Sequence, residues 1–231
     1  MARVLALHGQ PGSGRCFDVI ARFLGTGVSI VAPDRPGWGT SNDRPVDLLA
    51  QVAWVRGYLR EPTTLLGYSL GGALATLVAA TYPELVRGVV LVAPAVGREA
   101  LLWVDRILGM PGVGHLVGGL VAAAVERSPA RALELRPSHA FVVEQRSLLD
   151  HLEEVEAARR SLPAPTVVVA GRRDRVVPAR ATLALLEEVP TARLVLVDAG
   201  HDVLERAPGV VAACVREVAR NAQARARGRG G

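Results

Sequence analysis

Residues 63–81, TTLLGYSLGGALATLVAAT, decide the fold of this chain. The run begins as an apolar strand and continues as a helix of small residues, and Ser69 stands at the change, with Gly67 and Gly71 two residues to either side. Such a tight turn strains the serine backbone, lifts the hydroxyl clear of it and leaves no room for Cβ atoms two residues away. The pattern also arises by chance, so it predicts a nucleophile only if the rest of the chain supplies the partners.

Short apolar runs alternate with helical patterns on both sides of this turn. Strands are predicted at 3–9, 28–34, 63–69, 88–95, 166–174 and 193–201, and helices at 15–25, 46–59, 71–81, 179–188 and 208–222. Near-continuous apolar strands are typical of a sheet covered on both faces, and strict alternation with helices favours parallel pairing. We therefore expect an α/β fold with a doubly wound, mostly parallel sheet of about six strands.

One segment interrupts the alternation. Residues 97–162 contain several helical stretches and no convincing strand. Since open α/β folds bind their ligands at the carboxyl edge of the sheet, we interpret this segment as a helical cap insertion over that edge. The core is then formed by residues 1–96 and 163–222. The arginine-rich end, residues 223–231, has no apolar period and is expected to be a disordered basic tail.

The composition argues against several classes of function. The formal net charge is +5, but all 27 basic residues are arginine and they are scattered, so we expect no nucleic-acid partner. Cys16 and Cys214 form neither a C-x-x-C pair nor a disulfide framework, and no metal-ligand motif is present, so we expect no metal and no cofactor.

No apolar run is long enough for a membrane span or a signal peptide, which favours a cytoplasmic protein. The oligomeric state is not indicated.

A serine hydroxyl needs a base to take its proton at neutral pH. His201 follows Gly200 at the end of the last predicted strand and is the natural candidate. We interpret His139 and His151, in helical cap sequence, as surface residues. His115, in a glycine-rich cap loop, is either structural or part of a pocket. His8 ends the first strand, where it suits bracing a loop more than base catalysis.

The base in turn needs an acid that holds its tautomer and stabilises its cation. Asp174 ends the strand that precedes the one leading to His201, and we predict it as the acid. The alternative is that it only forms a turn or pairs with a neighbouring arginine. Asp198 and Asp202 lie too near His201 in sequence for a good side-on hydrogen bond, and Asp34 leads into a loop that we interpret as a packed turn.

Acyl chemistry also needs backbone N–H groups that bind the developing oxyanion. Leu70 supplies one, at the start of a helix whose dipole helps. The loop 8–14, HGQPGSG, supplies the other through the N–H of Gln10, because Gly9 allows a sharp turn and Pro11 fixes it. This loop matches neither glycine-rich phosphate-binding pattern.

Taken together, the stretches HGQPGSG, DRPGWGTSN, GYSLGG, GRRDRVVP and GHDVLERAP resemble the α/β-hydrolase fold family over residues 3 to about 218. The family's first two strands have no counterpart, because the chain opens directly on the strand that leads to the loop 8–14. The resemblance implies a nucleophile, an acid, a base and two oxyanion N–H groups, which are Ser69, Asp174, His201, Gln10 and Leu70.

Because position 69 is serine and not aspartate, the likeness to epoxide hydrolases and haloalkane dehalogenases is limited to the scaffold. We expect a carboxylesterase-like serine hydrolase that cleaves small to medium carboxylic esters through an acyl-enzyme, with the cap residues Trp103, His115 and Leu116 in the substrate pocket. A thioesterase, a C–C bond hydrolase, a perhydrolase or a lyase with the same residues stays open. So does a ligand-binding receptor or signalling module with slow turnover.

Overall fold

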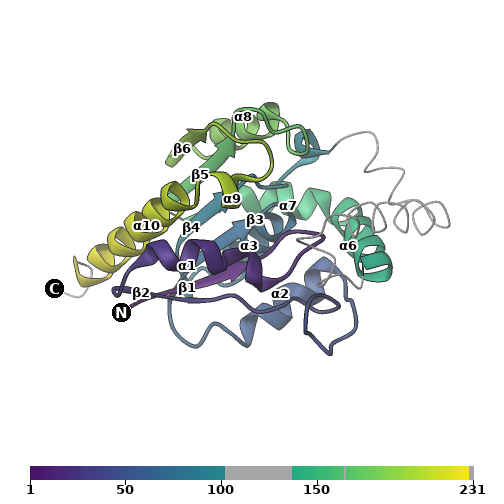
Figure 1. Ribbon diagram of the computed structural model, residues 1–231, viewed down its shortest axis with the longest axis horizontal. Helices are drawn as coiled ribbons and strands as arrows, with labels where there is room; N and C mark the ends of the chain where they lie inside the picture. The colour runs from purple at the N-terminus through teal and green to yellow at the C-terminus, as the bar shows by residue number, and fades with distance from the viewer. Residues whose placement is uncertain (102–136, 164, 229–231) are drawn as a thin grey trace.

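The computed structural model describes residues 1–101, 137–163 and 165–228. Its centre is one six-stranded sheet with the order β2-β1-β3-β4-β5-β6, and every neighbouring pair is parallel (Figure 1). The strands are β1 (Ala2–Leu7), β2 (Val28–Val31), β3 (Thr63–Tyr68), β4 (Val86–Val92), β5 (Thr166–Gly171) and β6 (Ala192–Val197). The prediction of a mostly parallel sheet of about six strands is confirmed.

The strand order places a topological switch point between β1 and β3. After β1 the chain moves outward to β2, whereas after β3 it moves in the opposite direction to β4. The loops that leave β1 and β3 therefore diverge, and open α/β sheets bind ligands in the crevice that this divergence creates. Leu65 of β3 pairs in register with Leu5 of β1 and Val89 of β4, so the strand that leads to Ser69 lies inside the sheet.

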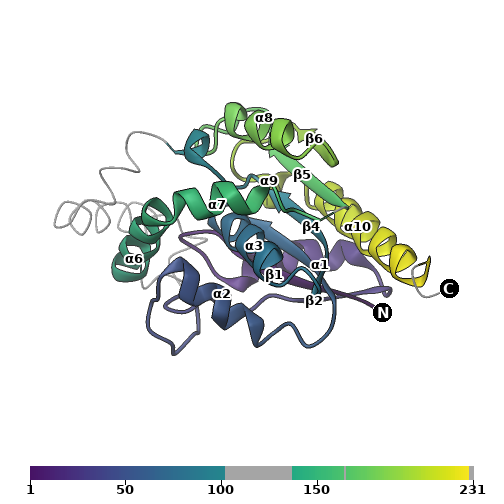
Figure 2. The same ribbon diagram turned by 180° about the vertical axis from the view of Figure 1, so that it is seen from behind.

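Helices cover both faces of the sheet because strand side chains alternate between two apolar layers. Leu5, Leu65 and Val89 contribute to one layer, and Val4, Leu66 and Val90 contribute to the other. The first layer lies under α2 (Leu48–Arg56), α3 (Leu70–Thr81), α7 (Leu152–Arg159) and α8 (Ala179–Glu188), and Figure 2 shows these helices on one face of the sheet. The opposite layer lies under the short η1 (Gly14–Phe17), α1 (Asp18–Leu24), α9 (Val203–Arg206) and α10 (Pro208–Gly228).

The described part of the segment predicted as a cap includes a helix that packs on the core. After η2 (Arg98–Ala100), its described part contains α6 (Pro137–Asp150) and α7. Val155 and Ala158 of α7 join the same buried cluster as α3, so α7 is a core helix. The division into a core and a cap insertion at residues 97–162 stays a prediction. Trp103, His115 and Leu116 lie outside the described residues.

The C-terminal helix is longer than predicted. We expected it to end at residue 222 and a disordered tail to follow, but α10 continues to Gly228. Val211, Val215 and Val218 pack under the sheet, which anchors the helix that then continues past this contact. Within the described parts of the chain, none of the helices combines the length and the apolar character that crossing a membrane requires.

Candidate active site

The turn between β3 and α3 carries Ser69 in a conformation that side chains rarely adopt. Its φ is 54° and its ψ is −121°. A Cβ on Gly67 would lie 2.5 Å from the carbonyl oxygen of Gly71, and a Cβ on Gly71 would lie 2.0 Å from the carbonyl oxygen of Leu7. Both distances are far below a van der Waals contact, so the two glycines are required by the tight turn and by its packing against β1.

Backbone hydrogen bonds hold this strained serine in place. Its N–H donates to the carbonyl of Val92 at 3.0 Å, and its carbonyl accepts from the N–H groups of Gly72 at 2.8 Å and Ala95 at 3.1 Å. Neighbouring backbone therefore supplies the contacts that over-determine a strained φ, ψ pair and allow it to persist.

The structure joins Ser69, His201 and Asp174 by two hydrogen bonds. His201 Nε2 lies 3.0 Å from Ser69 Oγ, and His201 Nδ1 lies 2.9 Å from Asp174 Oδ2. An ionised Asp174 can only accept, so Nδ1 carries the ring proton and Nε2 is left to accept from the serine hydroxyl. This is the arrangement that general-base activation of a serine requires.

Asp174 is itself fixed by the turn that follows β5. Its second oxygen, Oδ1, accepts from the N–H groups of Val176 at 2.8 Å and Val177 at 2.9 Å. The side chain is only 3% exposed. The carboxylate is therefore held by its own loop on one oxygen and by His201 on the other, and it makes none of the arginine pairs that the alternative interpretation required among the described residues.

The other acids and histidines take different partners. Asp198 pairs with Arg173 at 2.9 Å, and Asp202 accepts from the N–H of Gly200 and pairs with Arg206 at 3.0 Å. In α6 and at the start of α7, His139 is exposed and His151 pairs with Glu154. His115 lies outside the described residues.

Tyr68, the residue before the serine, supports the imidazole in a way that the sequence analysis missed. Its ring stacks on His201 with centroids 5.3 Å apart and an interplanar angle of 30°. Its hydroxyl donates to the backbone carbonyl of His201 at 2.9 Å. An aromatic residue at this position of G-x-S-x-G was the available signal, but the sequence alone does not say which loop it faces.

His8 braces the loop 8–14, as its place in the sequence suggested. The side chain is fully buried, its Nδ1–H donates to the carbonyl of Gly9 at 2.7 Å, and its Nε2 accepts from the N–H of Arg35 at 3.0 Å. Burial, followed by the positive charge of Arg35, lowers the pKa of His8 well below the ordinary 6.5, against the opposing effects of the Gly9 carbonyl and Asp34. His8 is therefore a neutral structural imidazole.

The loop 8–14 lies directly beside the serine. A Cβ on Gly9 would lie 2.9 Å from Ser69 Cβ, so only glycine allows this approach. Among the described residues, neither Gln10 nor Leu70 donates its N–H to a backbone carbonyl outside the regular elements. The Gln10 side chain donates to Gln145 Oε1 of α6 at 2.6 Å, a contact that the sequence did not reveal.

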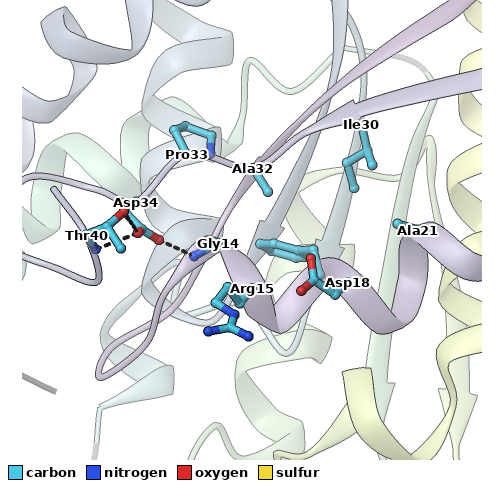
Figure 3. Close-up of a pocket in the computed structure, with 10 residues that line it drawn as sticks. Gly14, Arg15, Asp18, Ala21, Ile30, Ala32, Pro33, Asp34 and Thr40 are labelled. Atoms are coloured by element: carbon cyan, nitrogen blue, oxygen red, sulfur yellow. Dashed lines mark hydrogen bonds between the residues drawn. The ribbon is translucent and has the colours of Figure 1, made fainter. Parts of the chain in front are cut away.

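A surface pocket with a volume of about 510 Å³ opens between η1, α1 and the end of β2 (Figure 3). One of its two acidic lining residues, Asp34, is already engaged, because Oδ1 accepts from the N–H of Gly14 and Oδ2 accepts from the N–H and hydroxyl of Thr40. Burial acts to raise the pKa of Asp34, but these hydrogen bonds outweigh it and hold the pKa below the ordinary 3.8. Asp34 therefore ties two loops together, in agreement with a packed turn.

No group of three or more His, Cys, Asp or Glu side chains in the described part of the chain is arranged to hold a metal ion. The groups that lie at Ser69 are an imidazole, a carboxylate and backbone N–H groups.

Comparison with known proteins adds a family and several relatives. The family model described as "Alpha/beta hydrolase family" matches residues 4–213. The monoacylglycerol lipase of Mycolicibacterium smegmatis is 28% identical over 80% of this chain and 75% of its own length. The 2-hydroxymuconate semialdehyde hydrolase of Pseudomonas sp. (strain CF600) is 30% identical over 74% of this chain and 69% of its own length.

Two further matches establish less, one because it covers a small part of the chain and the other because its sequence identity is low. A probable serine hydrolase of Drosophila melanogaster is 37% identical over 35% of this chain, and the matched part spans about a quarter (27%) of that protein. The structure of an esterase from Thermogutta terrifontis superimposes with a TM-score of 0.75 at 20% identity and covers 96% of this chain and 90% of the esterase. At that identity the likeness shows the fold alone. The three relatives matched by sequence are a lipase and two other hydrolases, which supports hydrolase activity.

Proposed function

Because this chain belongs to the alpha/beta hydrolase family, we propose that it is a serine hydrolase that cleaves small to medium carboxylic esters through an acyl-enzyme intermediate. The observation that carries the proposal is the continuous hydrogen-bonded path from Ser69 Oγ through the His201 ring to Asp174. A neutral serine is a weak nucleophile, and this path gives it a base of fixed tautomer.

In the proposed reaction, His201 Nε2 takes the proton of Ser69 as Oγ attacks the ester carbonyl carbon. Asp174 stabilises the resulting imidazolium. The tetrahedral intermediate collapses when the bond from the carbonyl carbon to the alcohol oxygen breaks, and His201 returns its proton to the departing alcohol. Water then attacks the acyl-enzyme with His201 again as base, which releases the carboxylic acid and restores the serine.

The N–H groups of Gln10 and Leu70 are proposed to bind the oxyanion of each tetrahedral intermediate. Leu70 begins α3, where the helix dipole favours a negative charge. Gly9 brings the backbone before Gln10 against Ser69. An oxyanion N–H of this kind commonly contributes about 2.7 to 4 kcal/mol to the transition state. The mechanism needs no metal ion or organic cofactor.

An ester is favoured as the substrate by the name of one relative, a monoacylglycerol lipase. A second candidate is the hydrolysis of a semialdehyde rather than an ester, because another relative is a 2-hydroxymuconate semialdehyde hydrolase. The two reactions use the same scaffold and differ in the bond presented to the site. Rates measured with a panel of acyl esters and thioesters, compared with the rate on 2-hydroxymuconate semialdehyde, separate them.

The deciding experiment compares wild type with Ser69→Ala and with Ser161→Ala, which replaces an exposed serine after α7. Each protein is treated with a fluorophosphonate probe and assayed with p-nitrophenyl acetate and butyrate. We expect wild type and Ser161→Ala to be labelled and to turn over steadily, while Ser69→Ala loses both properties. Equal rates for wild type and Ser69→Ala would refute the proposal, and labelling with a single burst would favour the receptor alternative.

A further inference from the structure

A buried polar cluster lies behind the loop 8–14 and takes no part in the proposed proton transfers. It consists of Arg35, which follows β2, Gln51 of α2 and Glu144 of α6, and their exposed fractions are 0%, 0% and 1%. Arg35 and Glu144 form an ion pair, and Gln51 Nε2 donates to Glu144 Oε1 at 2.9 Å. Charged side chains are almost never buried to this degree unless they are paired, so the burial of Arg35 depends on the partners that the cluster provides.

The guanidinium of Arg35 uses all of its hydrogen-bonding capacity. Nη1 donates to Glu144 Oε1 and, at 2.8 Å, to Gln51 Oε1. Nη2 donates to Glu144 Oε2 at 3.2 Å and to the carbonyl of Gly9 at 3.0 Å, while Nε donates to the carbonyl of His8 at 3.0 Å. A guanidinium has five N–H groups, and these are five acceptors. Lysine, with three donors and no planar fork, cannot reproduce the set.

Two of these acceptors belong to the loop that leads to the oxyanion site. The carbonyl of Gly9 and the N–H of Gln10 are the two polar groups of one peptide unit, and that unit is planar. Gly9 O is held from two directions, by Arg35 Nη2 at 3.0 Å and by His8 Nδ1 at 2.7 Å. Since the carbonyl cannot turn, the N–H of Gln10 on the opposite side of the same plane cannot turn either.

The charge of Arg35 also acts on that N–H through the peptide unit. A hydrogen bond from a cation to a carbonyl polarises the amide and strengthens its N–H as a donor. The carboxylate of Glu144 balances the charge of the buried Arg35 guanidinium and so holds it in place. The next residue, Gln145, accepts a hydrogen bond from the Gln10 side chain at 2.6 Å. Helix α6 therefore contacts this loop directly through Gln145 and indirectly, by way of Arg35, through Glu144.

We propose that Arg35 is a positioning residue that aims the Gln10 N–H at the oxyanion, with Glu144 and Gln51 holding its guanidinium. The proposal rests on the proposed function, because the oxyanion exists only if Ser69 attacks a carbonyl group. A buried ion pair adds little net stability compared with apolar residues of similar volume. The cluster is therefore better explained by the geometry that it imposes than by the stability that it adds.

The test uses the double variant Arg35→Met/Glu144→Leu, which replaces the pair by apolar side chains and leaves no unpaired buried charge. We expect an unchanged circular dichroism spectrum, a kcat for p-nitrophenyl butyrate that falls at least about tenfold toward the ~10²–10³-fold loss typical of a missing oxyanion donor, and a KM within about threefold of wild type. Affinity for an alkylboronic acid, which mimics the tetrahedral intermediate, falls in parallel with kcat/KM, whereas affinity for the carboxylate product does not.

Two further variants separate positioning from stability. Arg159→Met removes another buried arginine that donates to a carbonyl, that of Val96, and pairs with Glu99 and Glu188, yet contacts no residue of the loop 8–14. It is expected to keep kcat within about twofold of wild type. Arg35→Lys retains a charge for Glu144, so it folds even if the double variant does not, and it is expected to lower kcat in the same direction.

The outcomes distinguish this inference from the function on which it rests. If Ser69→Ala is inactive but a folded Arg35 variant keeps wild-type kcat and boronic acid affinity, the inference is wrong and the serine hydrolase proposal stands. If Ser69→Ala is as active as wild type, the proposed function fails and the inference fails with it. Parallel losses of kcat and of boronic acid affinity in the Arg35 variants alone support the positioning role.

Discussion

The two loops that meet at Ser69 are held in place by different physical means. The turn after β3 is fixed by backbone, through a serine at φ 54°, glycines at 67 and 71 and three main-chain hydrogen bonds. The loop after β1 is fixed by side chains, through Arg35, His8 and a glutamate 109 residues away from that arginine. The first device is steric and uses main-chain groups, whereas the second is electrostatic and uses side chains from segments that are far apart in the sequence.

Asp174→Asn tests whether chemistry can be lost while both loops stay intact, and it has the largest expected effect. An asparagine still packs in the turn after β5 but favours the wrong tautomer of His201, so kcat is expected to fall about 10⁴-fold, or roughly 5.5 kcal/mol of activation free energy. Steady-state kinetics with p-nitrophenyl butyrate measure the loss. The matched variant Asp198→Asn, at an exposed pair with Arg173, is expected to retain activity.

Gly71→Ala disrupts the close contact between the turn after β3 and the end of β1. The new Cβ would lie 2.0 Å from the carbonyl oxygen of Leu7 and 2.6 Å from that of His8, so α3 and β1 have to separate. Overpacking of this kind costs about 1–3 kcal/mol. Because the new Cβ clashes with two backbone carbonyl groups, which cannot move aside easily, we expect a loss of about 3 kcal/mol in the free energy of unfolding. Urea denaturation measures it. Gly27→Ala, which meets nothing within 4 Å, serves as the control, and an equal loss there would contradict the steric argument.

The pH dependence of the free energy of unfolding tests the electrostatic environment of His8, which braces the loop after β1. Burial and Arg35 lower the pKa of His8 below 6.5 in the folded protein. Above pH 6.5 His8 is neutral in both states, whereas below it the unfolded chain binds a proton that the folded chain does not. Stability is therefore fully present above pH 6.5 and falls as the pH falls toward the folded pKa, by at most about 1.4 kcal/mol per pH unit for this one group.

Denaturant unfolding at pH 7.5 and 5.5 measures this fall, and His8→Asn identifies its source. The asparagine keeps a donor near the Gly9 carbonyl but does not titrate, so its stability should depend less on pH than that of wild type. A fall of the same size in both proteins would assign the effect to other groups.

Tyr68→Phe has the smallest expected effect. It keeps the ring stacked on His201 and removes only the hydroxyl that donates to the His201 carbonyl at 2.9 Å. One such hydrogen bond contributes about 1 kcal/mol, so kcat/KM is expected to fall about fivefold with little change in fold. Tyr68→Ala, which also removes the stacked ring, should lose more. If the two variants were equal, the ring would have no role in placing the imidazole.

Much of the fold could be predicted because its signals are local. The six apolar runs, each a few residues long and separated by helical patterns, correspond to the six strands, and the helix predicted at 179–188 matches α8. The less predictable features lie where tertiary packing decides. Val155 and Ala158 of α7 join the core cluster, and α10 extends past residue 222. The short α9 was not predicted, because four residues carry too little periodicity.

The candidate site divides in the same way. Ser69, Asp174 and His201 could be named from the sequence because each follows a predicted strand, and the carboxyl ends of parallel strands meet at one edge of a sheet. Glu144 and Gln145 carry no such marker, since a glutamate and a glutamine in a helix are ordinary surface residues by composition. They reach the candidate site only because the folded chain brings them within hydrogen-bonding distance of Arg35 and Gln10.

The sequence by itself determined where the chain turns and which side chains stand at those turns, because glycine spacing and strand periodicity act over a few residues through steric contact. The tertiary structure alone decided which peptide plane is held rigid beside the serine, because the charged pair that holds it comes from the loop after β2 and from α6, with a glutamine of α2 between them. Burial gives those charges their strength, and burial exists only after the sheet and its helices have come together.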